Sequence, residues 1–410
     1  MQEFRAGLPR LLYLGFAFPP GLAELNPGIN PAGHALETRM ISQLRRYFDI
    51  RSAGVLPIEL PEPKPGWTAD TLDAASGIDH EIILVEKPPE LLHRLRSLSR
   101  LKSEYRRWQA DGWEPKSVMV YNLSPIYNAF LRWLRRQPNC PKLVLLLLDS
   151  PNLGQRLRWL KRFRRRFKPL YVADSEMVLQ FDACAGLSRA TEKYFSPRGV
   201  PFMWIPGGCT PARALRDEGS SSGAVPDAQI RFGYFGALGP YAGAKQLAEI
   251  FIERRIPGTL EICGHGGCEE DFKRLAHANR SLKFHGLMTP DDSLRFGRTC
   301  DVLVNPRPIT HGNENNFASK LFDYALTGRA ILTSRLSGVE LVLGPEAYYF
   351  DAQSFSTSLG HALMELAGTP RPELSRRGMA IQQRVISEYS WEKQCARLAD
   401  FIDQIGPGAH

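Results

Sequence analysis

Residues 302–334 read VLVNPRPITHGNENNFASKLFDYALTGRAILTS. An apolar strand, a polar loop, a helix and a second apolar strand follow one another in this stretch. The helix is predicted to begin near Ala318 or Ser319, and Gly328 stands where helices commonly end in the left-handed conformation. Two short apolar strands joined by a helix are typical of a parallel sheet that is buried on both faces.

The same alternation extends in both directions from this stretch. Candidate strands lie at 11–16, 82–85, 118–121, 143–148 and 171–173, and then at 231–235, 259–263, 302–305 and 330–333. An amphipathic helix is expected between Ala35 and Phe48, because apolar residues recur there at spacings of three and four. The pattern predicts an α/β protein with two tandem Rossmann-like, doubly wound parallel-sheet domains facing a central cleft.

The composition suits a folded protein with two different halves. The 410 residues are 43% apolar and 23% charged, which excludes a disordered or fibrous chain. The net charge of +9 is concentrated in residues 1–205, since the rest of the chain is close to neutral. Gly, Ser and Pro are frequent after Ile205. We therefore predict domains as follows: a basic N-terminal domain over 1–205, a linker over 206–227, a second domain over 228–385 and a C-terminal helix over 386–410 that packs back toward the first domain.

Other features bear on location. The longest apolar run, Leu143–Leu148, is far shorter than the ~20 residues that span a bilayer. The first residues do not resemble a signal peptide. The 7 cysteines are an odd number spread thinly, which argues against a disulfide framework. A cytoplasmic protein, peripheral on the inner face of the cell membrane at most, is the expectation.

The helix that follows the polar loop has the chemistry of an anion site. A helix N-terminus at the carboxyl end of a strand presents backbone N–H groups and a positive dipole end, which suit a diphosphate. Lys320 in the first turn can add a cation, and Asp323 can accept from a sugar or ribose hydroxyl. The alternative is an ordinary αβ unit whose charged side chains are merely solvated.

Residues 319–334 resemble the donor-site helix of GT-B glycosyltransferases, specifically of the retaining family 4. Further motifs of that family are similar to segments of this chain in the same order, namely 205–209, 232–236, 260–266, 284–286, 300–306 and 389–391. The first half matches more loosely, at 18–20, 32–34 and 172–175. The resemblance implies a GT-B fold and an enzyme that transfers a sugar, with retention and without a metal, from a nucleotide-diphosphate sugar of the UDP or GDP type to a glycan or lipid-linked acceptor.

The resemblance also implies roles for residues. The second domain would hold the donor, with Lys320 neutralising the leaving diphosphate, the N–H groups of Ala318 and Ser319 binding the same oxygens, and Asp323 standing where the family has its ribose-binding Glu. The other residues expected at the donor are Gly236, His265, Arg307, Asn316 and Phe317, and those expected on the acceptor side are Gly33, His34, Asn122 and Asp149. The loop from Gly28 to His34 would approach the cleft, because Gly33 permits close backbone contact. The alternative is a helix entry turn with a His near its start.

The chain departs from the family's pattern at several positions. The family's paired acids correspond here to Asn315 and Asp323, so contact with the transferred sugar falls to Glu314, Asn315 or Asn316. Most members carry Arg and Lys at the positions of Ala237 and Ala242. Lys245, Arg307 or Lys320 could offset the loss of these two cations. Most members also carry a His at the position of Asn122. These departures leave two alternatives open: a non-catalytic scaffold that docks on the membrane, and a GT-B sugar-nucleotide epimerase.

The first half carries a strongly basic segment. Residues 155–168 contain eight basic side chains and no acidic one, with apolar residues at helical spacing. Such a basic amphipathic helix is typical of an anionic membrane surface, here through Arg156–Lys168. The alternatives are a solvated helix and a nucleic-acid contact, but no recognised nucleic-acid module occurs, so no nucleic-acid partner is expected. Surface polysaccharide, lipopolysaccharide or glycolipid assembly is the expected pathway.

Cofactor motifs are missing from the sequence. No two aspartates stand two positions apart, so the Asp-x-Asp metal clamp of the other large glycosyltransferase fold does not occur. Neither a dinucleotide fingerprint nor a P-loop is intact. Cys263, His265 and Cys268 would supply at most three zinc ligands from one Gly-rich turn. We expect no metal and no cofactor besides the nucleotide-sugar substrate.

Overall fold

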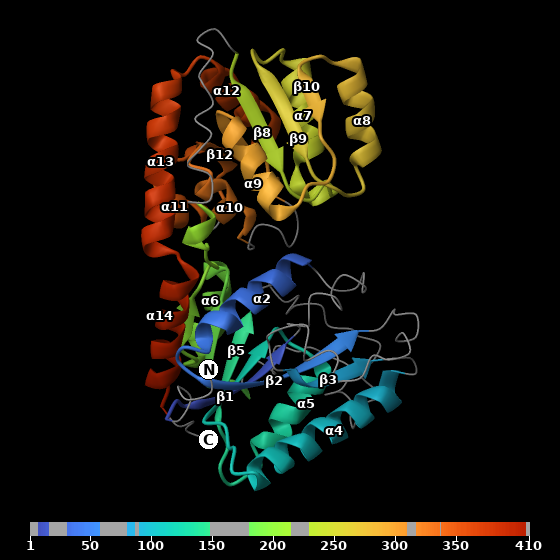
Figure 1. Ribbon diagram of the computed structural model, residues 1–410, viewed down its shortest axis with the longest axis vertical. Helices are drawn as coiled ribbons and strands as arrows, with labels where there is room; N and C mark the ends of the chain where they lie inside the picture. Colours follow the sequence, from blue (N-terminus) through green and yellow to red (C-terminus); the bar gives the residue numbers. More distant parts are fainter. Residues whose placement is uncertain are drawn as a thin grey trace. The chain divides into compact units, whose positions relative to one another are not determined.

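The computed structural model (Figure 1) describes residues 7–15, 31–57, 80–86, 90–147, 180–214, 229–309, 317–336 and 338–406. The chain forms two compact units. Residues 206–390 make up one unit, and residues up to 205 together with those from 391 onward make up the other. Within the described ranges, no helix is both long and apolar enough to cross a membrane.

The first unit is built on a parallel sheet with the strand order β3-β2-β1-β4-β5-β6-β7. Neighbouring strands are parallel throughout. The strands are β1 (Arg10–Gly15), β2 (Asp49–Pro57), β3 (His80–Glu86), β4 (Ser117–Tyr121), β5 (Lys142–Leu147), β6 (Ala183–Gly186) and β7 (Phe202–Trp204). Alternate residues of one strand enter different cores: Leu11 and Tyr13 face one side, and Leu12 and Leu14 face the other.

Helices cover both faces of this sheet. On the face of Leu11 lie α2 (Pro31–Leu44) and α14 (Trp391–Gln404), which pack side by side (Figure 1). On the opposite face lie α4 (Glu90–Ala110) and α5 (Pro125–Leu134). The short helix α6 (Glu192–Phe195) joins β6 to β7. Burial on both faces explains why β5 is an almost continuous run of Leu and Val.

The second unit repeats the plan, with the order β10-β9-β8-β11-β12-β13 and parallel pairing throughout. Its strands are β8 (Arg231–Phe235), β9 (Thr259–Cys263), β10 (Leu282–Phe284), β11 (Val302–Asn305), β12 (Ala330–Ser334) and β13 (Tyr348–Phe350). Its helices are α7 (Ala244–Glu253), α8 (Glu269–Ala278), α9 (Pro290–Thr299), α10 (Lys320–Leu326), α11 (Val339–Leu343), α12 (Phe355–Ala367) and α13 (Arg371–Glu388). The first strand lies inside the sheet, and the strand order reverses beside it at β8 and β11. This switch point is where ligands bind in doubly wound sheets.

The predicted α/β class with two doubly wound parallel sheets is confirmed, while some elements differ. The strands predicted at 231–235, 259–263 and 302–305 have the same bounds in the structure. The strands β2, β6, β7, β10 and β13 were not predicted, because they are short or lack an apolar run, and the strand predicted at 171–173 lies outside the described residues.

The first helix begins earlier than predicted. It spans Pro31–Leu44 instead of Ala35–Phe48, and its first residue is a proline. Proline is favoured at that position because its fixed φ already suits a helix and its missing N–H would have no partner there. Gly33 and His34, expected in a loop, therefore lie in the first turn of α2. The prediction of a loop running to His34 is wrong.

Candidate functional site

Two glycine turns interlock at the carboxyl ends of β8 and β9. Gly236 and Gly264 have φ values of 142° and 152°, a backbone conformation that other residues rarely adopt. The Gly236 N–H donates to the carbonyl of Cys263 over 3.1 Å, and the Gly264 N–H donates to that of Gly286 over 2.8 Å. A Cβ atom on Gly264 would lie 1.9 Å from the Gly236 carbonyl oxygen. Both positions therefore require glycine.

The loop that follows β8 is also fixed against its other neighbours. The Leu238 N–H donates to the His265 carbonyl over 3.0 Å. Gly243, the N-cap of α7, has a φ of 74°, and a Cβ atom there would lie 1.6 Å from the carbonyl oxygen of Pro306. The loops after β8 and β9 and the start of the loop after β11, at Pro306, thus form one connected backbone surface beside the switch point of the sheet.

Lys320 reaches this backbone surface from the first turn of α10. Its ammonium Nζ lies 4.0 Å from the centroid of the Tyr234 ring and 5.7 Å from that of Tyr324. A Cβ atom on Gly236 would come within 3.3 Å of the Lys320 Cδ, so the absence of a side chain at Gly236 leaves room for the lysine. The cation is held against the aromatic rings by their quadrupoles.

The described group whose charge acts on Lys320 is itself positive. Burial lowers the pKa of the Lys320 ammonium to about 7, and the positive charge of Arg307 adds to the shift. Among the residues that the structure describes, no carboxylate forms an ion pair with Lys320. Two neighbouring cations, of which Lys320 has no acidic partner in the described part of the chain, favour the binding of an anion beside them.

The start of α10 agrees with the sequence prediction to within two residues. Its first helical residue is Lys320, and its N-cap Ser319 makes no side-chain capping bond. Phe317 and Ala318 are buried, whereas Ser319 is exposed, and the Phe317 ring lies 5.2 Å from that of Phe322. The helix ends at Leu326 with Thr327 as its C-cap, and Gly328 follows at the predicted C′ position with a φ of 69°. The backbone that leads into Lys320 is therefore anchored by apolar packing.

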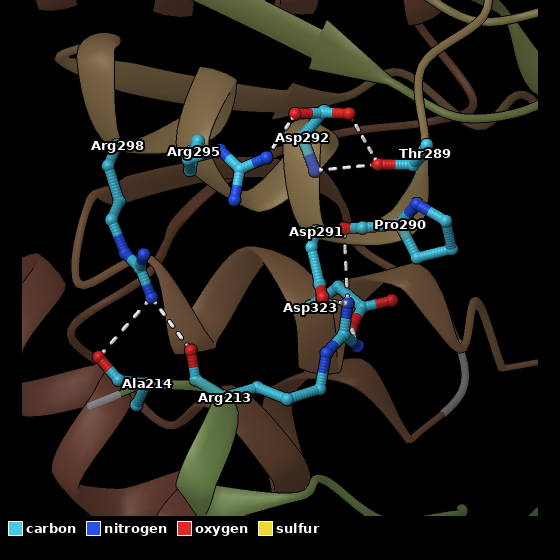
Figure 2. Close-up of polar contacts among 9 residues, drawn as sticks. All are labelled: Arg213, Ala214, Thr289, Pro290, Asp291, Asp292, Arg295, Arg298 and Asp323. Carbon is cyan, nitrogen blue, oxygen red and sulfur yellow. Dashed lines mark hydrogen bonds and ion pairs between the residues drawn. The ribbon is translucent and has the colours of Figure 1, made fainter. Parts of the chain in front are cut away.

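Asp323 is engaged by a residue that the sequence did not single out. Arg213 donates from Nη1 to Asp323 Oδ1 over 2.6 Å and from Nη2 to the carbonyl of Pro290 over 3.1 Å (Figure 2). The Arg213 side chain is 11% exposed and that of Asp323 is 34% exposed. No local pattern could have linked these residues, because 110 positions separate them.

Two further candidates in this unit have partners of their own. The His265 Nδ1 lies 2.6 Å from Glu269 Oε2, and its side chain is exposed. Lys245 donates to Asp271 on α8 over 2.8 Å. Lys245 is thus committed to an ion pair, whereas Lys320 lies over the Tyr234 ring and the charge of Arg307 acts on both of these residues. Among the described residues, no three potential metal ligands of the His, Cys, Asp and Glu types gather in one place.

The acceptor-side candidates belong to the first unit. Asn122 follows β4 with a φ of 54°, which is uncommon for a residue other than glycine, and its N–H donates to the Leu146 carbonyl over 2.8 Å. Next to Gly33 and His34 in α2, Glu37 is buried and accepts from the Tyr13 hydroxyl over 2.6 Å.

Several predicted residues cannot be placed. Glu314, Asn315, Asn316, Asp149 and the basic segment Arg156–Lys168 lie outside the described residues. Their predicted contacts stay predictions.

Comparison with known proteins gives similarity in structure alone. No protein-family model matches the chain, and no curated protein matches it in sequence. Anabaena HepE, solved in complex with UDP, is 13% identical with a TM-score of 0.64, and the match covers 96% of this chain and 99% of that chain.

Two further structures show the same similarity. A sucrose-phosphate synthase from Thermosynechococcus elongatus is 14% identical with a TM-score of 0.63, over 96% of this chain and 98% of that chain. A UDP-forming α,α-trehalose-phosphate synthase from Burkholderia vietnamiensis is 12% identical with a TM-score of 0.63, over 98% of this chain and 100% of that chain. Because these matches extend over nearly the whole length of every chain and include both sheets, the protein has the GT-B fold that its sequence predicts.

Proposed function

We propose that the protein is a glycosyltransferase that takes a sugar from a UDP-sugar donor. The observation that carries the proposal is the pair of cations, Lys320 and Arg307, beside the switch point of the second sheet. Structures with the same fold support the choice of nucleotide, because one is bound to UDP and another belongs to a UDP-forming synthase. GDP is the other nucleotide to test.

In this proposal the chemistry is stabilisation of the leaving group. The bond from the anomeric carbon to the diphosphate oxygen breaks, negative charge grows on the β-phosphate, the acceptor hydroxyl oxygen bonds to the anomeric carbon, and its proton passes to the departing diphosphate. Lys320 and Arg307 neutralise that charge, which raises the pKa of Lys320 again and keeps it protonated in the complex. The N–H groups of Ala318 and Ser319 add donors to the same oxygens. Since protein cations supply the neutralisation, we propose a metal-independent reaction whose rate EDTA leaves unchanged.

The remaining parts of the proposal concern the acceptor and the stereochemistry. The resemblance to retaining family 4 enzymes supports transfer with retention, as well as membership of that family. We assign the acceptor, a glycan or a lipid-linked sugar, to the first unit, where Gly33 and His34 in α2 and Asn122 after β4 are the described candidates. Surface polysaccharide, lipopolysaccharide or glycolipid assembly is the pathway class that such a reaction would serve.

Nucleotide binding and turnover of the wild-type chain test the proposal. We expect calorimetry to show UDP bound more tightly than GDP, and we expect slow release of UDP from a UDP-sugar when no acceptor is present. Release of a sugar epimer instead of UDP would favour the epimerase, and nucleotide binding without any turnover would favour the scaffold. Binding of neither nucleotide would contradict the assignment of the donor site.

A basic surface on α4 supports a peripheral place on the membrane. Its side chains Arg96, Arg100, Arg106 and Arg107 are exposed, and Leu92 and Leu95 are 50% and 39% exposed. Burial lowers the pKa of Lys102, and the positive charges of Arg106 and Arg136 add to this shift. Exposed leucines beside clustered arginines are typical of a surface that contacts anionic lipid.

The double variant Arg96→Glu/Arg100→Glu is expected to lose flotation with vesicles containing anionic lipid. Each basic residue near such a surface contributes about 1 kcal/mol to membrane binding. Replacing two of them should therefore weaken binding to the vesicles by roughly 30-fold or more. The matched control is Arg274→Glu/Arg376→Glu, which makes the same change in net charge at exposed positions of the second unit. Equal flotation of both variants and the wild type would contradict membrane contact through α4.

A further inference from the structure

We propose that Arg213 is a positioning residue for the nucleotide ribose, and that it acts by holding Asp323 in one orientation. In this arrangement Asp323 Oδ1 is bound by the guanidinium, and Oδ2 accepts a hydrogen bond from a ribose hydroxyl. The inference rests on the proposed function, because it assigns to the same site a preference for ribonucleotides over deoxyribonucleotides. Figure 2 shows the residues concerned.

The guanidinium of Arg213 is fixed by three acceptors. It donates to Asp323 Oδ1 over 2.6 Å, to the Pro290 carbonyl over 3.1 Å, and to Asp291 Oδ1 over 3.5 Å. The side chain is 11% exposed. A planar guanidinium bonded to both α10 and the start of α9 has little freedom to rotate. The Arg213 guanidinium therefore holds the Asp323 carboxylate, to which it donates a hydrogen bond, in one orientation.

The backbone that carries Arg213 is fixed as well. Residues Pro211–Arg213 form a 3-10 turn, in which the Arg213 N–H donates to the Thr210 carbonyl over 3.0 Å. Arg298 on α9 donates to the carbonyls of Arg213 and Ala214 over 2.8 and 3.2 Å. Figure 2 shows the Arg298 side chain directed at these two carbonyl oxygens. The support for Asp323 therefore comes from an ordered segment and not from a long flexible side chain alone.

Asp323 keeps one side available. Its side chain is 34% exposed, and among the described residues Oδ2 has no hydrogen-bond donor. It lies one turn beyond Lys320 on α10, and residues three apart share a face of a helix. An ionised carboxylate only accepts hydrogen bonds, so its natural ligand there is a hydroxyl group. With the diphosphate at Lys320, the ribose is the part of a nucleotide that carries hydroxyl groups within one helical turn.

The test compares UDP with 2′-deoxy-UDP and 3′-deoxy-UDP by calorimetry on the full chain. A hydrogen bond to a charged group contributes about 1.5–3 kcal/mol, so the wild type should prefer UDP over at least one deoxy analogue by roughly 10–100-fold. In Arg213→Gln the preference for UDP should fall to a few-fold. The variant's affinity for the deoxy analogue should stay close to that of the wild type. Arg295→Gln is the matched control, because Arg295 pairs with Asp292 in the same region without contacting Asp323.

The variants Arg213→Lys and Arg298→Gln guard against misfolding of Arg213→Gln. A lysine keeps the charge but cannot form the planar fork, so an intermediate preference is expected. Arg298→Gln leaves the Arg213 guanidinium in place and removes only the hydrogen bonds to the backbone of Arg213 and Ala214. A smaller decrease in the preference for UDP is therefore expected. If the wild type binds none of the nucleotides, the proposed function itself is wrong. If it binds UDP and the preference survives in Arg213→Gln and Arg213→Lys, only the inference is overturned, and Arg213 is a structural anchor.

Discussion

Lys320→Met is expected to weaken the binding of UDP about 100-fold near neutral pH, the upper end of what one charge-assisted hydrogen bond contributes. Methionine keeps the unbranched chain that lies over the Tyr234 ring but removes the ammonium group. Isothermal titration calorimetry measures the effect. Lys245→Met is the control, because Lys245 is paired with Asp271 and should leave the affinity unchanged.

The same substitution should change the pH dependence of binding. In the free protein the pKa of Lys320 is lowered to about 7 by burial and by Arg307, so the ammonium loses its proton as the pH rises above 7. A bound diphosphate favours the charged form, so binding takes up a proton. We therefore expect the wild-type affinity to fall from pH 7 to pH 9, and the affinity of Lys320→Met to stay level over that range. Parallel pH profiles would contradict the role of Lys320.

The stability of the free protein should change with pH in the opposite direction to its affinity for UDP: it should rise as the pH rises. The pKa of Lys320 is lower in the folded chain than the ordinary value of about 10.4 in an unfolded chain, so the unfolded state binds more protons between pH 7 and pH 10. The buried charge therefore destabilises the fold fully below pH 7, and the effect disappears toward pH 10. Lys320→Met should have the higher Tm at pH 6, with the difference shrinking as the pH rises. A lower Tm at pH 6 would contradict desolvation of the ammonium.

Gly264→Ala is expected to destabilise the second unit by about 2–5 kcal/mol, which adds the strain of a positive φ to that of overpacking. The new methyl group would lie 1.9 Å from the carbonyl oxygen of Gly236, which is backbone and cannot rotate away. Relief requires the two glycine turns to separate, which would break the hydrogen bond from Gly236 to Cys263. Because Gly236 faces Lys320, UDP binding should weaken as well.

Thermal unfolding and urea titration measure this loss, and Gly267→Ala is the matched control. Gly267 lies in the same loop, yet nothing stands within 4 Å of the position its Cβ would take. The control should unfold like the wild type. A Tm for Gly264→Ala within about 2 °C of the control would show that the loops are free to move apart, since a change of 1 kcal/mol shifts Tm by about 2–4 °C in a domain of this size.

Several strands of the fold could be predicted from the types of residues that are neighbours in the sequence. Strands 231–235, 259–263 and 302–305 were predicted with their observed bounds because strands buried on both faces are mostly apolar, even though 259–263 also holds the buried, ion-paired Glu261. The strand 183–186, with the sequence Ala-Cys-Ala-Gly, carries no such signal, since its small side chains are selected by what packs on them.

The candidate site divides in the same way. The sequence alone predicted a helix that begins near Ala318 or Ser319 and is followed by Gly328 at C′, close to the observed Lys320–Leu326, because helical spacing and a glycine stop are properties of neighbouring residues. Only the tertiary structure decided that Lys320 lies on Tyr234, where burial lowers its pKa, and that Asp323 is held by Arg213. Desolvation and ion pairing depend on distances in space, and the folding of strands and helices into a sheet brings together residues that are far apart along the chain.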